Sequence, residues 1–351
     1  MDADHPRLWV SAVVERGRQR VANPVLAAVL VIGWMPVAFS VLAIDATAAT
    51  PLFVVSHSLA ALMVVFGPFD VWYYDQRLLP GFFDRAAEVA APGQEKRLKA
   101  LELKYQRIFA NYWWVTVGPW IALVLSVFFI SDDYLARQGI TTPVQYWSYF
   151  GFFAYWGLFS GLGFHGGTTT VLAIREFAEN VDLSIDPLHS DGLGGLSQIG
   201  HFAIRTTVIL STGALALPLS FQLATEIGVA EPVYVGVGLY ILLIAGIFLY
   251  PTFKVNRRAQ ALRESVLDQY RAKIRELESR LNDQIEQVDS EAELRENQSL
   301  QMEIQRVRRE FGDYRNVQLY PLSVGILIQL LSSLLLPVLF IVLEALLSHY
   351  L

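Results

Sequence analysis

The sequence predicts an all-α polytopic membrane protein with seven transmembrane helices, an inside N-terminus, an outside C-terminus and a cytosolic helical hairpin between helices six and seven. Hydrophobic residues make up 54% of the chain and charged residues 17%, against about 25% charged residues in soluble domains. The apolar residues gather in runs of about 20, the length that crosses a hydrocarbon core of ~30 Å. These runs indicate a multi-pass protein of the cell membrane that has the lipid bilayer as its surroundings.

The chain divides into segments by composition. Residues 1–23 carry arginines but no apolar run with a cleavage signal, so we expect a cytosolic amphipathic segment. Asn23-Pro24 then opens the first membrane span, because proline is tolerated in the first turn of a helix. The expected spans are 24–44, 51–72, 110–131, 144–172, 201–225, 232–252 and 321–347. The first six form the unit 24–252, with cytosolic loops at 73–109 and 173–200.

The distribution of basic residues predicts the orientation. Loop 73–109 is rich in lysine and arginine, whereas the loops expected on the other side of the membrane hold Arg137 as their one basic residue. Cytoplasmic loops of membrane proteins carry an excess of lysine and arginine. The N-terminus is therefore expected inside and, with seven spans, the C-terminus outside.

The charged segment 253–320 is expected to form the cytosolic hairpin. Apolar residues recur every three or four positions from Leu262 to Val288 and again from Leu300 to Tyr314, the spacing of one helix face. Interleaved charges of both signs are typical of a solvated helix face. We expect a turn at Asp289-Ser290 and a first arm that continues the sixth span. The simplest interpretation of this segment is a solvated coiled-coil hairpin without chemistry.

The sequence offers little for catalysis. The chain contains no cysteine, which excludes disulfides and thiol chemistry. No closely spaced histidine pair and no Gly-x-Ser-x-Gly motif occur. We therefore expect a protein that is not an enzyme and that needs no cofactor.

One polar constellation has the residue types of a metal site. His189 and Asp191 lie in the glycine-rich segment 186–196, which resembles segments of prokaryotic multi-pass proteins, and His165 and His201 flank it. Imidazole nitrogens and carboxylate oxygens together can bind a divalent metal. The alternative interpretation is a tight glycine turn in which Asp191 caps the next helix.

A second constellation is aromatic. Aromatic residues crowd the expected outer half of span four, and other outer halves add more. Such residues often form interfacial belts, but this run reaches far enough into the bilayer that some rings must face the bundle. An apolar pocket with few polar groups suits a small hydrophobic ligand. The candidate pocket residues are Phe53, His57, Trp120, Trp147, Phe150, Phe153 and Tyr234.

The last span carries a third constellation. Ser333, Pro337, Phe340 and Glu344 share one helix face, and Gln329 lies near the middle of the span. A carboxylate on a membrane helix is costly unless it meets water or a partner. Polar groups alternating with a bulky ring suit a pore helix with a hydrophobic constriction. In the alternative interpretation, Glu344 reaches the outer interface from the helix end.

The layout resembles the seven-helix ion channels of the insect odorant and gustatory receptor superfamily and their distant prokaryotic-type relatives. In that superfamily the sixth helix extends into the cytosol, a cytosolic helix returns, and the last membrane helix lines a tetrameric pore. The matching segments here are 232–288, 291–319 and 321–347. The receptors' last helix carries Thr-Tyr, an apolar stretch and Gln-Phe. Aligned on Glu344, this chain has Pro337-Val338 and Ala345 at the flanking positions, so the resemblance lies mainly in topology.

The sequence therefore favours a homo-oligomeric, tetrameric, ligand-responsive cation channel. Its expected partners are the bilayer, further copies of the chain and a small hydrophobic ligand, with no nucleic acid. Glu344 would concentrate cations, Ser333 and Gln329 would wet the inner vestibule, and Phe340 would form the gate. Two other functions stay open: a metal-dependent membrane enzyme using the histidine cluster, and a non-conducting sensor or scaffold whose hairpin recruits a partner.

Overall fold

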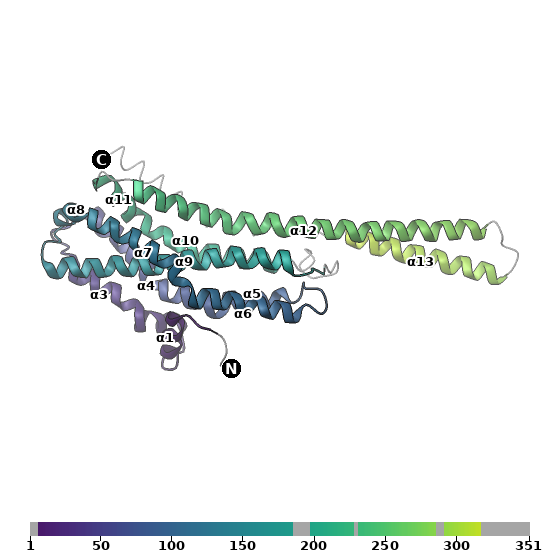
Figure 1. Cartoon of the computed structure of the whole chain (residues 1–351), viewed down its shortest axis with the longest axis horizontal. Coiled ribbons are helices and arrows are strands. Elements are labelled where there is room, and N and C mark those ends of the chain that lie inside the picture. Colours follow the sequence, from purple (N-terminus) through teal and green to yellow (C-terminus); the bar gives the residue numbers. More distant parts are fainter. Residues whose placement is uncertain (1–5, 185–196, 228–230, 286–290, 317–351) are drawn as a thin grey trace.

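The computed structural model describes residues 6–184, 197–227, 231–285 and 291–316, and in this part of the chain it is an elongated bundle of helices (Figure 1). One very long helix, α12, runs along the bundle and extends well beyond it, where α13 packs against it. No strand occurs among the described residues, apart from an isolated bridge between Ala90 and Leu183. The expectation of an all-α fold is confirmed for these residues.

The N-terminal segment is a helix docked against the bundle. Helix α1 spans Trp9–Arg18 and buries Val10 and Val14. The backbone N–H of Leu8 donates to Asp75 Oδ2 at 3.2 Å, and Trp72 Nε1 donates to Glu15 Oε1 at 2.8 Å. These contacts tie the amphipathic segment to the helix of the second span.

The first span consists of α2 (Pro24–Ala28), the π-helical turn η1 (Val29–Gly33) and α3 (Trp34–Ala43). Asn23 caps its start, because its side-chain oxygen accepts from the backbone N–H groups of Val25 and Leu26. Gly33 is buried in the π-turn, against the backbone of α4. The first span thus begins at Pro24, as the sequence predicted.

The second and third spans extend into what the sequence suggested to be a loop. Helix α4 (Pro51–Tyr73) continues through η2 (Tyr74–Leu78) into α5 (Leu79–Ala86), and α6 (Glu95–Asn111) leads to α7 (Trp113–Ile130) and the short α8 (Asp132–Arg137). Most of 73–109 is therefore helix. The reason is packing: Phe82 and Phe83 of α5 and Tyr105 of α6 are buried in the main core. Most of the charged residues lie on the outer faces, whereas Asp75 and Glu102 are buried.

Helix α9 (Pro143–Asn180) is the central helix of the bundle and longer than the predicted 144–172. Thr142 and Gln145 form a capping box at its start. The helix packs against α3, α4, α6, α7, α10 and α12. Glycines allow this close approach: a Cβ at Gly161 would lie 3.1 Å from a methyl carbon of Val117 on α7.

The fifth span is α10 (Ser197–Ser211), the 3₁₀ turn η3 (Thr212–Ala216) and α11 (Leu217–Ile227). The 3₁₀ turn lies just before Pro218, which has no N–H to continue an α-helical ladder. Thr212, the first residue of the turn, is thereby placed against α4. This break in the span shapes one wall of the cavity described below.

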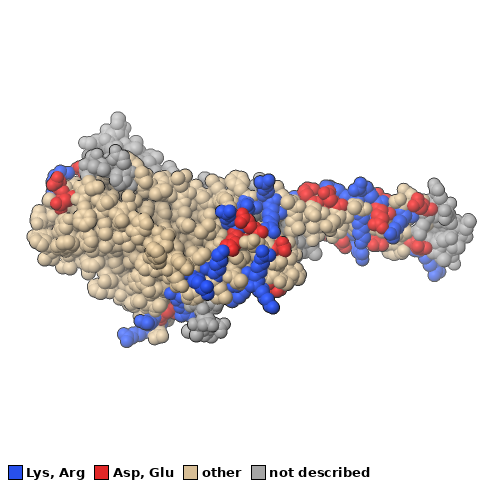
Figure 2. Space-filling model, viewed as in Figure 1, with Lys and Arg blue, Asp and Glu red and all other residues tan. Residues whose placement is uncertain are grey.

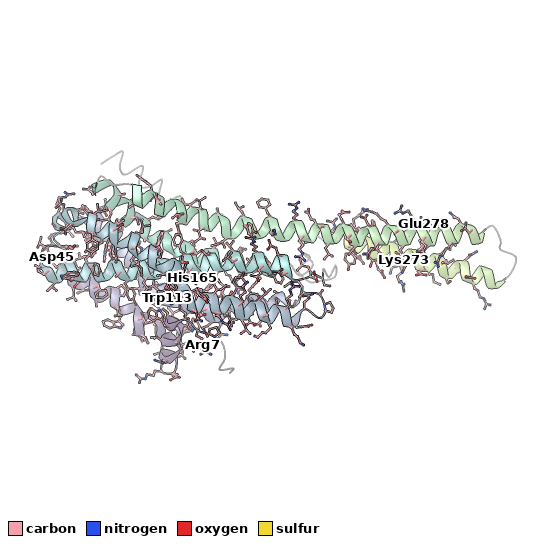
Figure 3. All side chains as sticks on the ribbon, viewed as in Figure 1. Arg7, Asp45, Trp113, His165, Lys273 and Glu278 are labelled. Carbon is pink, nitrogen blue, oxygen red and sulfur yellow. The ribbon has the colours of Figure 1, made fainter. Side chains whose placement is uncertain are left out.

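Helix α12 (Glu231–Ile285) is continuous over 55 residues, and α13 (Glu291–Asn316) returns antiparallel to it. Leu277, Ile304 and Val307 form the buried core between them. Ion pairs flank this core, with Arg308 to Glu278 at 2.5 Å and Lys273 to Glu303 at 3.6 Å. We call residues 257–285 and 291–316 the stalk (Figure 3 labels Lys273 and Glu278 on it). The predicted turn at Asp289-Ser290 lies outside the described residues.

Among the described residues, four helical segments are long and apolar enough to cross a membrane: Pro24–Ala43, Pro51–Ala86, Glu95–Ile130 and Ile199–Ala224. Helix α12 contributes the shorter apolar stretch Val233–Ile247. Helix α9 is not among the four. Its C-terminal half is rich in glycine and threonine, which suits a helix surrounded by other helices rather than by lipid. The predicted span 321–347 lies outside the described residues.

The surface of the bundle is that of a membrane protein. On the face in Figure 2, charged side chains gather at the two ends of the bundle, along its lower edge near α1 and along the stalk, and they leave a broad uncharged region. Large apolar side chains are exposed on this bundle, including Leu30, Val41, Trp114 and Leu242. An uncharged surface with many exposed apolar side chains is stable against lipid and costly against water.

The stalk core provides a test of the hairpin. We expect Val307→Asp to separate α13 from α12, because Val307 is 1% exposed and a charge buried there has no partner. The packing of α13 on α12 should be destabilised by about 3 kcal/mol. Limited proteolysis of the purified protein should then cleave α13 rapidly. Met302→Asp is the matched control, since Met302 on the same helix is 66% exposed, and equal protection of the two variants would contradict the packing.

Candidate ligand cavity

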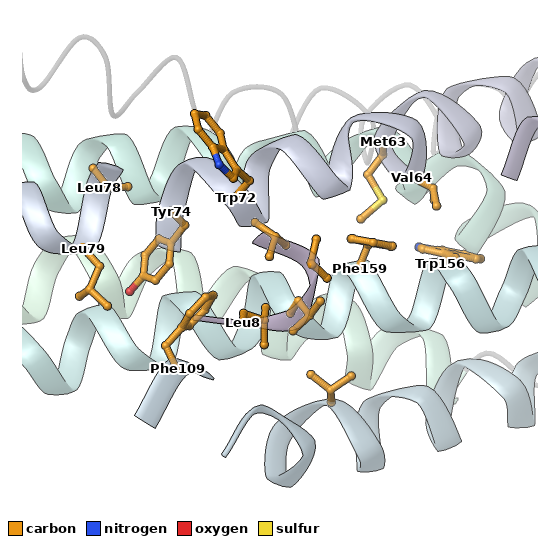
Figure 4. Packing of buried hydrophobic residues seen from close by; sticks show 14 of the residues in the cluster. Leu8, Met63, Val64, Trp72, Tyr74, Leu78, Leu79, Phe109, Trp156 and Phe159 are labelled. Atoms are coloured by element: carbon orange, nitrogen blue, oxygen red, sulfur yellow. The ribbon is translucent and has the colours of Figure 1, made fainter. Parts of the chain in front are cut away.

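An apolar cavity of about 140 Å³ lies between α4, α7, α9, the α10–α11 span and α12. Its wall is made mostly of aromatic and aliphatic side chains, several of which Figure 4 shows from close by. Those labelled in the figure are Met63, Tyr74, Phe109, Trp156 and Phe159. Helix α12 contributes Val233, Gly236, Val237 and Tyr240. The first residues of α12 and the interior of the bundle therefore share one chamber.

Most polar groups at the cavity wall already have partners in the protein. Ser160 Oγ accepts from Trp120 Nε1 at 2.8 Å and donates to the carbonyl of Trp156 at 2.7 Å. The hydroxyl of Tyr240 donates to the carbonyl of Leu210 at 2.7 Å. The hydroxyl of Tyr74 lies 2.9 Å from Thr170 Oγ1. These groups are satisfied without a ligand.

Asp70 is the exception. Its Oδ2 is 3.3 Å from Thr212 Oγ1, but that hydroxyl also lies 2.7 Å from the carbonyl of Ile209. A hydroxyl has one hydrogen to donate, and the shorter bond to Ile209 takes the larger share of it. The carboxyl group is thus held by a single weak hydrogen bond at the cavity wall.

A second hollow, lined by fewer residues, also borders Asp70. It is lined by Val25, Leu62, Met63, Phe66, Phe69, Asp70, Thr212 and Leu215. Leu62 and Phe66 are exposed, so this groove opens on the apolar surface of the bundle. Asp70, Met63 and Thr212 line both the groove and the cavity.

The structure distributes the predicted pocket residues over several places. Trp120 and Phe153 line the cavity. Phe150 packs partly buried against the main core beside Phe128, and Trp147 and Tyr234 are exposed on the bundle.

Phe53 and His57 lie in a solid part of the core. His57 is 3% exposed, its Nε2 is 2.8 Å from Ser40 Oγ and its Nδ1 is 3.3 Å from the hydroxyl of Tyr149. The rings of His57 and Phe152 lie 4.3 Å apart. This cluster fixes α3, α4 and α9 together and does not border the cavity.

His165 is also held by protein groups. Its Nε2 is 3.3 Å from the carbonyl of Ile108, which can only accept, so this nitrogen carries the proton. Its Nδ1 then accepts from Thr116 Oγ1 at 3.2 Å, and its ring stacks on Phe109. Both ring nitrogens of His165 therefore have hydrogen-bond partners within the protein. Figure 3 labels His165 in the bundle.

The other candidate metal ligands are apart or not described. His201 is exposed on α10, and His189 and Asp191 lie outside the described residues. Within 6–184, 197–227, 231–285 and 291–316, no group of three or more metal-binding side chains comes together. The predicted pore residues Gln329, Ser333, Pro337, Phe340 and Glu344 lie outside the described residues as well.

Comparison with known proteins found no match: no family model, no curated protein and no solved structure matches the chain. The function has to be argued from the site. Sequence reasoning placed Asp70 at the end of a span and gave it no role. The signal that was there is a carboxylate within an apolar helical run, which is a functional hypothesis by default.

Proposed function

We propose that the protein is a homo-oligomeric, ligand-responsive cation channel of the cell membrane. In this proposal four copies of the chain surround a pore lined by the segment 321–347, the stalks form a cytosolic anchor, and the internal cavity receives the stimulus. The observation that carries the proposal is α12, because a single continuous helix borders the cavity at one end and forms the stalk at the other.

A continuous helix transmits displacement because its backbone hydrogen bonds resist bending. Gly236 and Tyr240 of α12 line the cavity, and Leu277 lies some 40 residues later in the stalk core, about 60 Å along the helix at 1.5 Å per residue. A ligand that moves the cavity end of α12 would also move the stalk. Helix α13 runs back along α12 as far as Arg263, whose side chain donates to the carbonyl of Arg315 at 2.9 Å. The chain is therefore close to the bundle again before 321–347 begins.

Ion pairs hold α12 where it leaves the bundle. Lys254 lies 2.9 Å from Glu179 of α9, and Arg258 bonds the carbonyl of Ala178 and lies 3.4 Å from Asp182. The pKa of Glu179 lies below its ordinary value, mainly because Lys254 donates a hydrogen bond to the carboxylate and, to a smaller extent, because Arg175 does so too. Any stabilisation from this carboxylate is therefore present above its unfolded pKa and is lost as the pH falls through the lower folded pKa. At neutral pH this junction would act as a fulcrum for α12.

The proposed pore chemistry belongs to the last span. Glu344 would attract cations at the outer mouth, Phe340 would close the pore by dewetting, and Ser333 and Gln329 would hydrate the inner vestibule. Positive-inside loop charge supports the cytosolic position of the stalk in this proposal.

Single-channel recording in planar bilayers tests the proposal. Purified wild type should conduct cations, Glu344→Gln should reduce cation selectivity, and Phe340→Ala should raise the resting open probability about tenfold. Val342→Ala, on the opposite side of the proposed pore helix, is the matched control and should conduct as wild type. Absence of conductance in the wild type, or identical conductance and selectivity in both pore variants, would refute the pore assignment.

A further inference from the structure

We infer that the cavity binds a small organic cation, an amine whose ammonium group pairs with Asp70 and whose hydrocarbon part fills the aromatic chamber. This inference deepens the proposed function and rests on it only in taking the cavity as the site of the stimulus. It is carried by the position of Asp70 between two apolar hollows, with its single weak hydrogen bond.

Among the described residues, no basic side chain lines the cavity or the groove to pair with the carboxyl group of Asp70. A carboxylate away from water is costly unless it is paired, and the one hydroxyl near Asp70 is shared with a backbone carbonyl. A cationic ligand would supply the missing counter-charge and two or three N–H donors.

The rest of the wall suits the body of such a ligand. Trp120, Trp156, Phe159 and Tyr240 present aromatic surface to the chamber. Aromatic faces attract ammonium groups through their quadrupole, more strongly when water is excluded. A neutral alcohol would gain the same apolar contact but neither the ion pair nor the cation–π attraction.

The size of the chamber limits the ligand. Its volume of about 140 Å³ is close to that of apolar protein cavities that hold one benzene-sized molecule, about 150 Å³. A single six-membered ring with one amino group is therefore the expected class. A hard metal cation is a poorer fit, because it takes about six or more oxygen ligands and the other cavity oxygens are engaged in protein hydrogen bonds.

The groove gives such a ligand a route. Leu62 and Phe66 open it to the apolar surface, and Asp70, Met63 and Thr212 separate it from the cavity. An amphipathic amine that has partitioned into lipid would reach the carboxyl group first. The hydrocarbon part would then pass Met63, a flexible side chain that adapts to what it contacts.

Titration calorimetry on the full-length protein in phosphatidylcholine nanodiscs tests the inference, with empty nanodiscs as the blank. Cyclohexylamine and cyclohexanol are the probes, because they share one ring and differ in charge. Wild type should bind the amine at least about tenfold more tightly than the alcohol. Asp70→Asn should remove this preference and leave cyclohexanol binding within about twofold of wild type.

Two further variants complete the design. Gly236→Leu should abolish binding of both probes, since a Cβ at Gly236 would lie 3.6 Å from the Trp120 ring and a longer side chain would fill the chamber. Asp45→Asn, an exposed loop carboxylate at the end of the bundle, should bind both probes as wild type does.

Equal affinity of wild type for the two probes, or no binding of either, would overturn the inference. So would an Asp70→Asn protein that keeps its preference for the amine. If Asp70→Asn does not fold, the inference is still tested by the preference of the wild type for the amine and by the loss of binding of both probes in Gly236→Leu. Calorimetry needs no conductance, so amine binding without channel activity would refute the proposed function alone, and a conducting protein without amine preference would refute this inference alone.

Discussion

Gly33→Ala is expected to lower the stability of the purified protein by about 3 kcal/mol, seen as a fall of roughly 5–10 °C in its thermal midpoint in detergent. A Cβ at Gly33 would lie 2.5 Å from the backbone carbonyl oxygen of Val65. A backbone atom cannot swing aside as a side chain does, so α4 would have to move away from the first span. Small residues serve this purpose where membrane helices approach closely.

Gly118→Ala is the matched control for this prediction. Gly118 lies within α7, and a Cβ there would meet no atom within 4 Å. Alanine in an open helical position is about 1 kcal/mol more favourable than glycine, so this variant should be as stable as wild type or slightly more stable. Equal midpoints for Gly33→Ala and Gly118→Ala would contradict the described contact between η1 and α4.

Ala259→Pro is expected to uncouple the stalk from the bundle. Ala259 is fully buried in the main core at the point where α12 leaves the bundle, next to the junction with α9. Proline there removes a helical hydrogen bond and clashes with the preceding turn, at a cost of about 3 kcal/mol. Under the proposed function, conductance should fall about tenfold or more and the oligomer should dissociate, because the stalks no longer project in one fixed direction.

Ala259→Ser provides the comparison, since serine is nearly as small and keeps the backbone N–H. Light scattering after size-exclusion chromatography measures the mass of the particle, and bilayer recording measures the conductance. A proline variant with wild-type mass and conductance would show that α12 does not transmit anything from the cavity to the stalk. A serine variant as defective as the proline variant would assign the effect to packing rather than to helix continuity.

The sequence predicted best where periodicity is strong. The stripe from Tyr270 to Leu281 and the stripe from Leu300 to Val307 meet in the stalk, as their spacing indicated, whereas Leu262 packs against the main core of the bundle. No helices were predicted in loop 73–109, because its charges suggested solvent, although Phe82 and Tyr105 place apolar faces of α5 and α6 in the core. Charge density reports the outer face of a helix and not whether the helix packs.

The cavity was only partly predictable. Trp120 and Phe153 were expected in a pocket and line one, whereas Phe53 and His57 fill the core, because their depth in the bundle depends on how α3 and α4 cross α9. Asp70 was passed over because its carboxyl group becomes notable only beside Thr212, which is 142 positions later in the chain. Pairings of this range follow from tertiary packing and leave no local pattern.

Particle symmetry in lipid nanodiscs is the most direct measurement of the central claim. Single-particle imaging of the full-length protein should show fourfold rings, with the stalks gathered at the centre on one side of the membrane and the segment 321–347 around the axis. Such particles would place the proposed pore residues where ions pass. Monomers or dimers without a central opening, or rings in which the segment 321–347 faces lipid, would contradict the channel.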